Sequence, residues 1–198
     1  QDRREDREVH RAPRVDGDEE DEERRDDAGG EEQVEHDIED LMKVEIERKF
    51  LLASEGWRRE VQRSEYIRDG LIAISDERKT RVRIIGERAT LAVKTKRITG
   101  GRYEFEYDIP LEDAELLLAS CGSNATAKHR HYVLHEGLTW EIDEYDGILK
   151  GVVLAEVELD AIDQLIDMPS WIGREVTAQA PYRKINMLRE RQKDLNNP

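Results

Sequence analysis

The 198-residue chain is acidic: it carries 47 Asp and Glu against 32 Lys and Arg, a net charge of −15. Residues 1–42 hold 19 acidic and 7 basic residues, a net of −12, so the rest of the chain is close to neutral. A segment so charged and without aromatic residues cannot bury enough apolar surface to offset its ordering entropy, so we predict that residues 1–42 form a disordered acidic tail. We predict one domain over 43–192 and a short C-terminal tail over 193–198.

The composition also argues against several classes of protein. No apolar run approaches the length of a membrane helix. The single Cys121 cannot form an intrachain disulfide, and no Cys/His cluster indicates a structural zinc site. The chain shows no signal-peptide pattern, and an acidic tail repels nucleic-acid phosphates. We therefore expect a cytoplasmic protein that acts away from membranes and nucleic acid.

After the tail, apolar and polar residues alternate with the period of a β-strand. The alternation predicts strands over residues 44–52, 66–74, 79–86, 89–96, 102–109, 127–135, 138–146 and 152–159. Gly-containing turns separate them, and about eight short strands at this spacing predict a barrel or a sandwich. Helical patterns and caps predict helices over 54–61, 110–122 and 181–195.

One face of nearly every predicted strand carries paired charges. A half-exposed antiparallel sheet explains any single strand of this kind. It does not explain the whole set, because like charges at positions i and i+2 repel each other. A closed barrel with its charges inward does explain it: carboxylates then hold Mg²⁺ or Mn²⁺, and Arg and Lys hold phosphate oxygens. The apolar faces then point outward, to be covered by helices or, in a homodimer, by a second subunit.

The stretch EIERKF, Glu45 to Phe50, carries an ExExK motif. Charged motifs follow it in chain order up to about Arg191: Arg81-x-Arg83, Lys94, Glu104-x-Glu106, Lys128-x-Arg130, Glu141-x-Asp143 and Glu156-x-Glu158. This ordered set resembles the CYTH superfamily, the triphosphate tunnel metalloenzymes. The resemblance implies a mainly β fold with α+β character: a closed antiparallel eight-stranded β-barrel that forms a tunnel, with flanking helices.

The resemblance also implies an activity, the metal-dependent hydrolysis of inorganic triphosphate to diphosphate and phosphate. Alternatives on the same fold are a nucleotide or thiamine triphosphatase and an adenylyl cyclase. A non-catalytic polyphosphate-binding module is a further alternative, although intact carboxylate pairs favour an enzyme. The expected cofactor is Mg²⁺ or Mn²⁺, and the expected ligand is inorganic triphosphate or another small molecule that bears a triphosphate.

The site residues follow from the same motifs. We expect catalytic roles for Glu45, Glu47, Lys49, Glu104 and Glu106. Phosphate binding is expected of Lys49, Arg81, Arg83, Lys94, Lys128, Arg130 and Lys184. Metal ligation is expected of Glu45, Glu47, Glu141, Asp143, Glu156 and Glu158.

Two stretches depart from the pattern of the relatives. The second strand of relatives often reads Gln-Gly-Tyr-Leu, whereas this chain has Asp69-Gly70-Leu71-Ile72. The final helix of relatives usually begins Tyr-x-Asn, whereas this chain has Tyr182-Arg183-Lys184. The sequence leaves open whether Arg183 or Lys184 reaches the tunnel, and it leaves open how Leu71 affects the choice of substrate.

Overall fold

A computed structural model describes residues 44–75, 77–98 and 101–196 of the chain. The strands are β1 (Val44–Leu52), β2 (Val61–Ser75), β3 (Arg78–Ile85), β4 (Arg88–Lys94), β5 (Arg102–Asp108), β6 (Ala125–His135), β7 (Leu138–Tyr145), β8 (Val153–Leu159) and β9 (Ile172–Glu175). The α-helices are α2 (Leu111–Ser120) and α3 (Lys184–Asn196). Short 3₁₀ helices are η1 (Gly56–Arg59), η2 (Gly122–Asn124), η3 (Gly147–Leu149) and η4 (Ala180–Tyr182).

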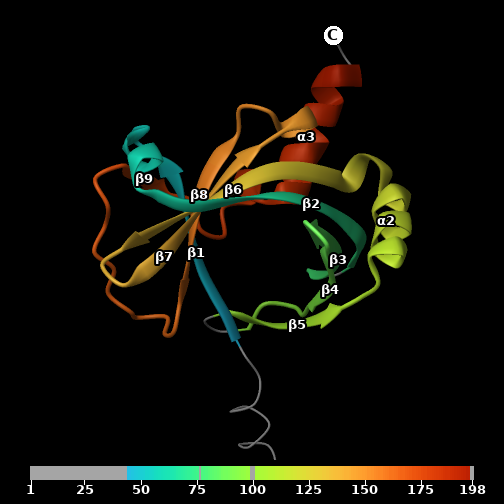
Figure 1. The fold of residues 1–198 in the computed structure, drawn as a ribbon, viewed down its shortest axis with the longest axis horizontal. Coiled ribbons are helices and arrows are strands. Elements are labelled where there is room, and N and C mark those ends of the chain that lie inside the picture. The colour runs from blue at the N-terminus through green and yellow to red at the C-terminus, as the bar shows by residue number, and fades with distance from the viewer. Residues whose placement is uncertain (1–43, 76, 99–100, 197–198) are drawn as a thin grey trace, which may run out of the picture. The chain divides into compact units, whose positions relative to one another are not determined.

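The strands form one antiparallel sheet in the order β5-β4-β3-β2-β6-β7-β8-β1-β9. β5 also pairs with β1, through Val44 opposite Tyr103 and Glu45 opposite Arg102, and this pairing closes the first eight strands into a barrel (Figure 1). β9 pairs with β1 farther along the same strand edge, at Phe50 and Leu52. The predicted closed eight-stranded antiparallel barrel is therefore confirmed.

The predicted helix over 54–61 is wrong. Only Gly56–Arg59 form a 3₁₀ turn, and Val61 already begins β2, which runs for 15 residues and shifts its register against β3 between Leu71 and Ala73. Trp57 contributed an apolar position to the helical pattern, but in the structure its side chain packs into an apolar cluster on the outside of the barrel. The helix predicted over 181–195 begins at Lys184, because Tyr182 closes a 3₁₀ turn and Arg183 is extended.

Other boundaries agree more closely with the predictions. α2 lies within the predicted 110–122, and Gly122 follows it with a φ of 52°, a conformation that glycine adopts easily at a helix end. α3 continues through Asn196, so the first residues of the predicted C-terminal tail are helical. The predicted acidic tail over 1–42 lies outside the described residues. Within the described residues, no helix is both long and apolar enough to cross a membrane.

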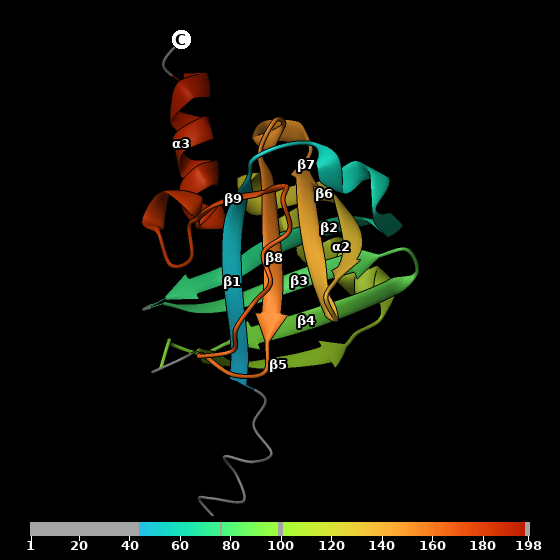
Figure 2. The ribbon, with the colours of Figure 1, turned by 90° about the vertical axis from the view of Figure 1, so that its left-hand side faces the viewer.

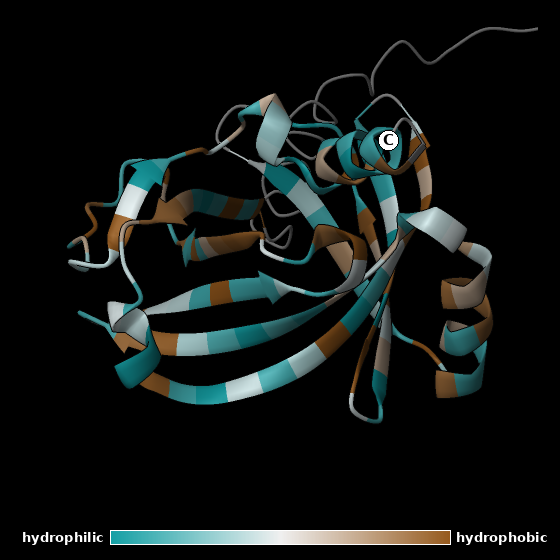
Figure 3. Ribbon diagram, turned by 90° about the horizontal axis from the view of Figure 1, so that it is seen from above, coloured by the Kyte–Doolittle hydropathy of each residue, from teal (hydrophilic) through white to brown (hydrophobic). Residues whose placement is uncertain are grey.

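The apolar faces of the strands point outward, as the alternation predicts, and bands of opposite hydropathy alternate along the strands in Figure 3. Outside β1, β7 and β8 lies a cluster built on Phe50, Trp57, Trp140, Ile142 and Trp171. α2 contributes Ala114 to a second cluster over β3 and β4, and α3 contributes Met187 and Leu188 to a third beside the β7–β8 connection. The apolar core of the protein therefore lies outside the barrel, and the charged side chains of the strands point into the barrel interior.

Candidate active site

The barrel encloses a cavity of about 700 Å³. Twelve Lys and Arg and nine Asp and Glu side chains line it, so the lining is basic although the whole chain has a net charge of −15. Of the predicted site residues, all except Asp143 contribute to the lining. The period-two alternation thus brings together residues that lie far apart in the sequence.

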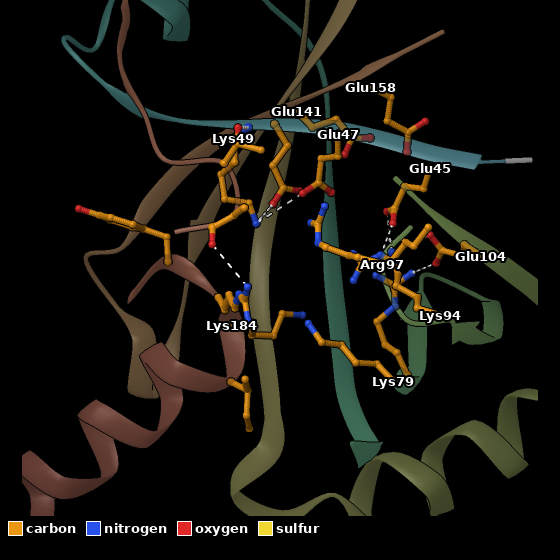
Figure 4. Close-up of a pocket in the computed structure, with 18 of the residues that line it drawn as sticks. Glu45, Glu47, Lys49, Lys79, Lys94, Arg97, Glu104, Glu141, Glu158 and Lys184 are labelled. Carbon is orange, nitrogen blue, oxygen red and sulfur yellow. Dashed lines mark hydrogen bonds and ion pairs between the residues drawn. The ribbon is translucent and has the colours of Figure 1, made fainter. Parts of the chain in front are cut away.

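The strands β7, β8 and β1 are neighbours in the sheet (Figure 2). Their inward side chains form a wall of carboxylates, of which Glu47, Glu141 and Glu158 are labelled in Figure 4. Glu47 lies directly opposite Glu158, and Glu156 lies directly opposite Glu141. Like charges in directly opposed positions destabilise a sheet. Lys49 and Arg130 offset the repulsion in the Glu156–Glu141 pair, whereas the Glu47–Glu158 pair has only Lys49 at 3.7 Å from Glu47.

Glu47 is only weakly neutralised although it is largely buried. Its ion-pair partner among the described residues is Lys49, whose Nζ lies 3.7 Å from Glu47 Oε1, and the Glu47 side chain is 21% exposed. Burial, with the neighbouring Glu156, raises the pKa of Glu47 above its usual range. Burial likewise raises the pKa of Glu141, despite an ion pair with Arg130. A cation bound beside them would stabilise the ionised form of both carboxylates.

Glu45, two residues before Glu47, has the opposite environment. Its two oxygens accept from Lys94 Nζ at 2.5 Å and from Arg102 Nε at 2.8 Å. Burial alone would raise the pKa of Glu45, but Lys94 and Arg102 outweigh it and lower the pKa to about 2. Lys94 Nζ also lies 2.6 Å from Glu104, so β1, β4 and β5 are tied together by ion pairs where the barrel closes (Figure 4).

A second group of ion pairs lies between β1, β6, β7 and β8. Lys49 Nζ lies 2.5 Å from Glu156, and these charges keep the pKa of Glu156 well below its usual range although burial opposes the shift. Arg130 donates to Glu156 at 3.1 Å and to both oxygens of Asp143 at 2.7 Å. Lys128 also pairs with Asp143, which is 1% exposed. Asp143 thus lies behind the cavity lining and holds two cations that face the cavity.

The opposite wall is basic and is formed by β3, β4, β6 and the start of α3. The Nε atoms of Arg81 and Arg83 are buried and have no hydrogen-bond partner among the described residues. Arg81 Nη2 lies 3.1 Å from Glu104 and 3.5 Å from Glu106, so these two predicted catalytic residues orient a guanidinium. Guanidinium groups with unused donors can form charge-assisted hydrogen bonds to phosphate oxygens.

Lys184, and not Arg183, lies deep in this wall. Lys184 Nζ is 2.5 Å from Asp69 Oδ1, whereas the Arg183 side chain is 43% exposed and lies 4.0 Å from Glu77. Leu71, in the same strand as Asp69, is buried and lines the cavity. The structure therefore answers which of the two cations extends inward.

Several cavity residues were missed from the sequence. Lys79 and Arg102 continue the inward faces of β3 and β5 and could have been found by extending the alternation by one step. Arg97 and Arg189 are exposed residues at the rim, outside any strand, and no local pattern marks them. Asp69, buried beneath the lining, was noted in the sequence only as a departure from the pattern of relatives.

Within the described residues, no three His, Cys, Asp or Glu side chains lie close enough together to hold a metal ion. One reason is that Glu45 and Glu156 already form ion pairs with Lys and Arg side chains. The donor chemistry nonetheless fits a hard divalent cation, because the wall offers only carboxylate oxygens, in opposed pairs that repel each other. Within the described part of the chain, Glu47 has one ion pair, with Lys49 at 3.7 Å, and Glu158 has none.

Comparison with known proteins agrees with this geometry. Residues 43–189 match the CYTH domain family. The chain belongs to the CYTH domain family. An inorganic triphosphatase of Acetivibrio thermocellus is 34% identical over 155 residues, which cover 78% of this chain and 99% of that protein.

Solved structures extend the comparison to the CYTH fold. Two structures of the protein NE1496 align with TM-scores of 0.54 and 0.53, at 31% and 29% identity, and the second is described as an inorganic triphosphatase. The alignments cover 73% and 74% of this chain and 97% and 95% of those chains. This CYTH domain therefore spans nearly the full length of each of these relatives.

Proposed function

We propose that this CYTH domain hydrolyses inorganic triphosphate to diphosphate and phosphate with Mg²⁺ or Mn²⁺. The single observation that carries the proposal is the division of one cavity into a carboxylate wall on β7, β8 and β1 and a basic wall on β3, β4, β6 and α3. Phosphoryl transfer depends on neutralising the charge of the transferred group and on positioning the attacking water. The similarity to inorganic triphosphatases supports the proposal.

The basic wall binds and orients the substrate in this proposal. Arg81 and Arg83 offer buried donors that lack protein partners, and Lys94, Lys128 and Lys184 add ammonium groups around them. Lys49 and Arg130 lie where the two walls meet, each already paired with Glu156. They contact the phosphate nearest the carboxylates. Glu104 and Glu106 keep Arg81 aimed into the cavity.

The carboxylate wall holds the divalent cation. Glu47, Glu141 and Glu158 are the first candidates, because Glu47 and Glu141 have raised pKa values and Glu158 lies directly opposite Glu47. Glu45 and Glu156 can join only if they exchange their Lys and Arg partners for the metal. A bound divalent cation would neutralise phosphate charge and acidify a water molecule.

Asp143 stays a predicted ligand, but its contacts favour a different role. Both of its oxygens are occupied by Lys128 and Arg130, and it contributes nothing to the lining. In this arrangement Asp143 keeps two phosphate-binding cations in place. Loss of its charge would leave Lys128 without an ion-pair partner among the described residues and would remove one of the three carboxylates that Arg130 contacts.

Inorganic triphosphate is favoured over a nucleotide because the aromatic residues of the described lining are only Tyr145 and Tyr182. A nucleotide site usually provides an apolar or aromatic surface for the base. A phosphate-release assay over triphosphate, thiamine triphosphate, ATP and long-chain polyphosphate, each with Mg²⁺, Mn²⁺ or chelator, tests the proposal. The highest kcat/KM should belong to triphosphate with metal. A higher kcat/KM for ATP, or full activity in chelator, would refute it.

A further inference from the structure

Asp69 is the most completely buried carboxylate on the basic side of the barrel, at 1% exposure, and it takes no part in the cavity lining. Its Oδ1 accepts from Thr126 Oγ1 at 2.7 Å and from Lys184 Nζ at 2.5 Å. Its Oδ2 accepts from Arg83 Nη2 at 3.4 Å. It therefore contacts two of the cations assigned to phosphate binding, although its own side chain does not line the cavity.

The sheet register fixes Asp69 in this place. On β2, Asp69 lies directly opposite Arg83 of β3 and Thr126 of β6. Lys184 comes from the first residue of α3, 115 positions later in the chain. The helix that carries Lys184 packs through Met187 and Leu188 into the third apolar cluster, beside the β7–β8 connection. The Asp69–Lys184 ion pair thus connects the N-terminus of α3 to the basic wall of the cavity.

The charges around Asp69 are unbalanced. Burial would raise the pKa of Asp69, but Lys184, Lys128, Arg83 and Arg81 outweigh it and hold the pKa well below its usual range. Asp69 therefore stays ionised at neutral pH. Arg81 and Lys128 also pair with other carboxylates, but among the described residues Arg83 and Lys184 have ion pairs with Asp69 alone. The positions of these two cations depend on that buried counter-ion.

We propose that Asp69 is a positioning residue of the phosphate site: it holds the Lys184 ammonium at the surface of the cavity, beside Arg83, so that Lys184 binds one end of the triphosphate. The proposal refines the phosphate site described under the proposed function. It differs from a purely structural role, in which the Asp69–Lys184 ion pair would only fasten α3 to the barrel.

The test is a double-mutant cycle with Asp69→Asn and Lys184→Met, each measured for triphosphate KM, kcat and melting temperature. Asp69→Asn keeps an acceptor for Thr126 but removes the charge that holds Lys184. Each single variant should raise KM about 10-fold, the size expected for one charged hydrogen bond, and should change kcat less. The double variant should exceed Lys184→Met by less than threefold, because no ammonium remains to be positioned.

Three results overturn the proposal. Independent effects that multiply in the double variant would show that Asp69 does not act through Lys184. A lower melting temperature with KM unchanged would show a structural role alone. A lower KM in Asp69→Asn would show that the negative charge of Asp69 merely opposes phosphate binding.

If Asp69→Asn does not fold, a milder substitution at a neighbour of Asp69 can test the same positioning role. Thr126→Val removes the hydroxyl that donates to Asp69 and changes no charge. Thr90→Val is its matched control, because Thr90 is also buried in a barrel strand and its hydroxyl has no partner among the described residues. Thr126→Val should raise KM by about threefold, in line with loss of one neutral hydrogen bond, and Thr90→Val should not. Equal KM values for the two variants would overturn the proposal.

Binding measured by calorimetry, with triphosphate in metal-free buffer, separates this proposal from the proposed activity. If the wild-type protein binds triphosphate in this buffer but does not hydrolyse it after Mg²⁺ or Mn²⁺ is added, the proposed activity is wrong. The double-mutant cycle of Asp69→Asn and Lys184→Met can then be evaluated from the dissociation constants for triphosphate, with the same fold-changes expected as for KM. Absence of any coupling in those constants would overturn the positioning role by itself.

Discussion

Replacing Glu45 or Glu47 by Gln should change the stability of the metal-free protein in opposite directions. The two carboxylates lie two residues apart on the same face of β1, but Glu45 is bound by Lys94 and Arg102, whereas Glu47 faces Glu158. Glu45→Gln removes the partner of two buried cations and should destabilise the fold. Glu47→Gln removes a repulsion and should stabilise it.

The expected sizes follow from the contacts. Lowering the pKa of Glu45 from 4.5 to about 2 corresponds to a contribution of about 3 kcal/mol, and the side chain is only 10% exposed. Relief of one directly opposed like-charge pair is worth up to about 1 kcal/mol. For a domain of this size, the melting temperature should fall by about 6–12 °C in Glu45→Gln and rise by about 2–4 °C in Glu47→Gln.

The pH dependence of stability should also differ in sign between Glu45 and Glu47. The folded-state pKa of Glu45 is lowered, so its stabilisation is present above pH 4.5 and is lost as the pH falls toward about 2. The folded-state pKa of Glu47 is raised, so the ionised group destabilises the fold at neutral pH. The advantage of Glu47→Gln should therefore vanish well below pH 4.5, where Glu47 is protonated in both the folded and the unfolded state.

Activity should respond differently from stability. Both variants remove a carboxylate from the proposed metal site, so both should lose at least ~10²-fold in kcat, in line with losses of single groups that stabilise a transition state. Both should also need more metal for half-maximal activity. Glu47→Gln would then be more stable than the wild-type protein and much less active.

The assay is thermal unfolding in chelator from pH 2.5 to 8, followed by triphosphate turnover against metal concentration. Glu87→Gln is the control, because Glu87 is exposed in the turn between β3 and β4, and it should change neither property. If Glu45→Gln and Glu47→Gln shift the melting temperature in the same direction by similar amounts, the different environments of the two carboxylates do not matter. The electrostatic reasoning would then be refuted.

Four further predictions can be tested with the same assays. Lys49→Ala should raise the KM for triphosphate more than the metal requirement, because a cation is not a metal ligand; the reverse order would contradict this role. Burial, with Arg102 and Lys94, lowers the pKa of Lys79 to about 8. Triphosphate binding at pH 8.5 should therefore be accompanied by proton uptake, seen by calorimetry in buffers of different ionisation enthalpy and reduced in Lys79→Met. Gly70→Ala would place a Cβ 2.6 Å from Cys121 Sγ and should destabilise the fold by ~1–3 kcal/mol, measured by thermal unfolding. Deletion of residues 1–42 should leave the melting temperature and the triphosphate kcat/KM nearly unchanged, and a large drop in either would show that the tail contributes to the domain.

The sequence by itself determined the barrel and most of the residues that line it. Strand alternation is a local property, since successive side chains point to opposite faces whatever the strand later pairs with. Glu45, Glu47 and Lys49 could therefore be assigned to one face from β1 alone, and Arg81 and Arg83 from β3 alone. Helix ends were less certain: Trp57 mimicked a helical pattern because the residue is held by tertiary packing.

Only the tertiary structure decided which charges are paired. Glu45 and Glu47 share a motif and a face, yet one is neutralised by Lys94 and Arg102 from two other strands and the other is not. Asp69 and Lys184 are two separate departures from the pattern of relatives, and they meet at 2.5 Å across 115 residues of chain. The energy of a charge depends on burial and on neighbours brought close by folding, and the period of a strand holds no information about either.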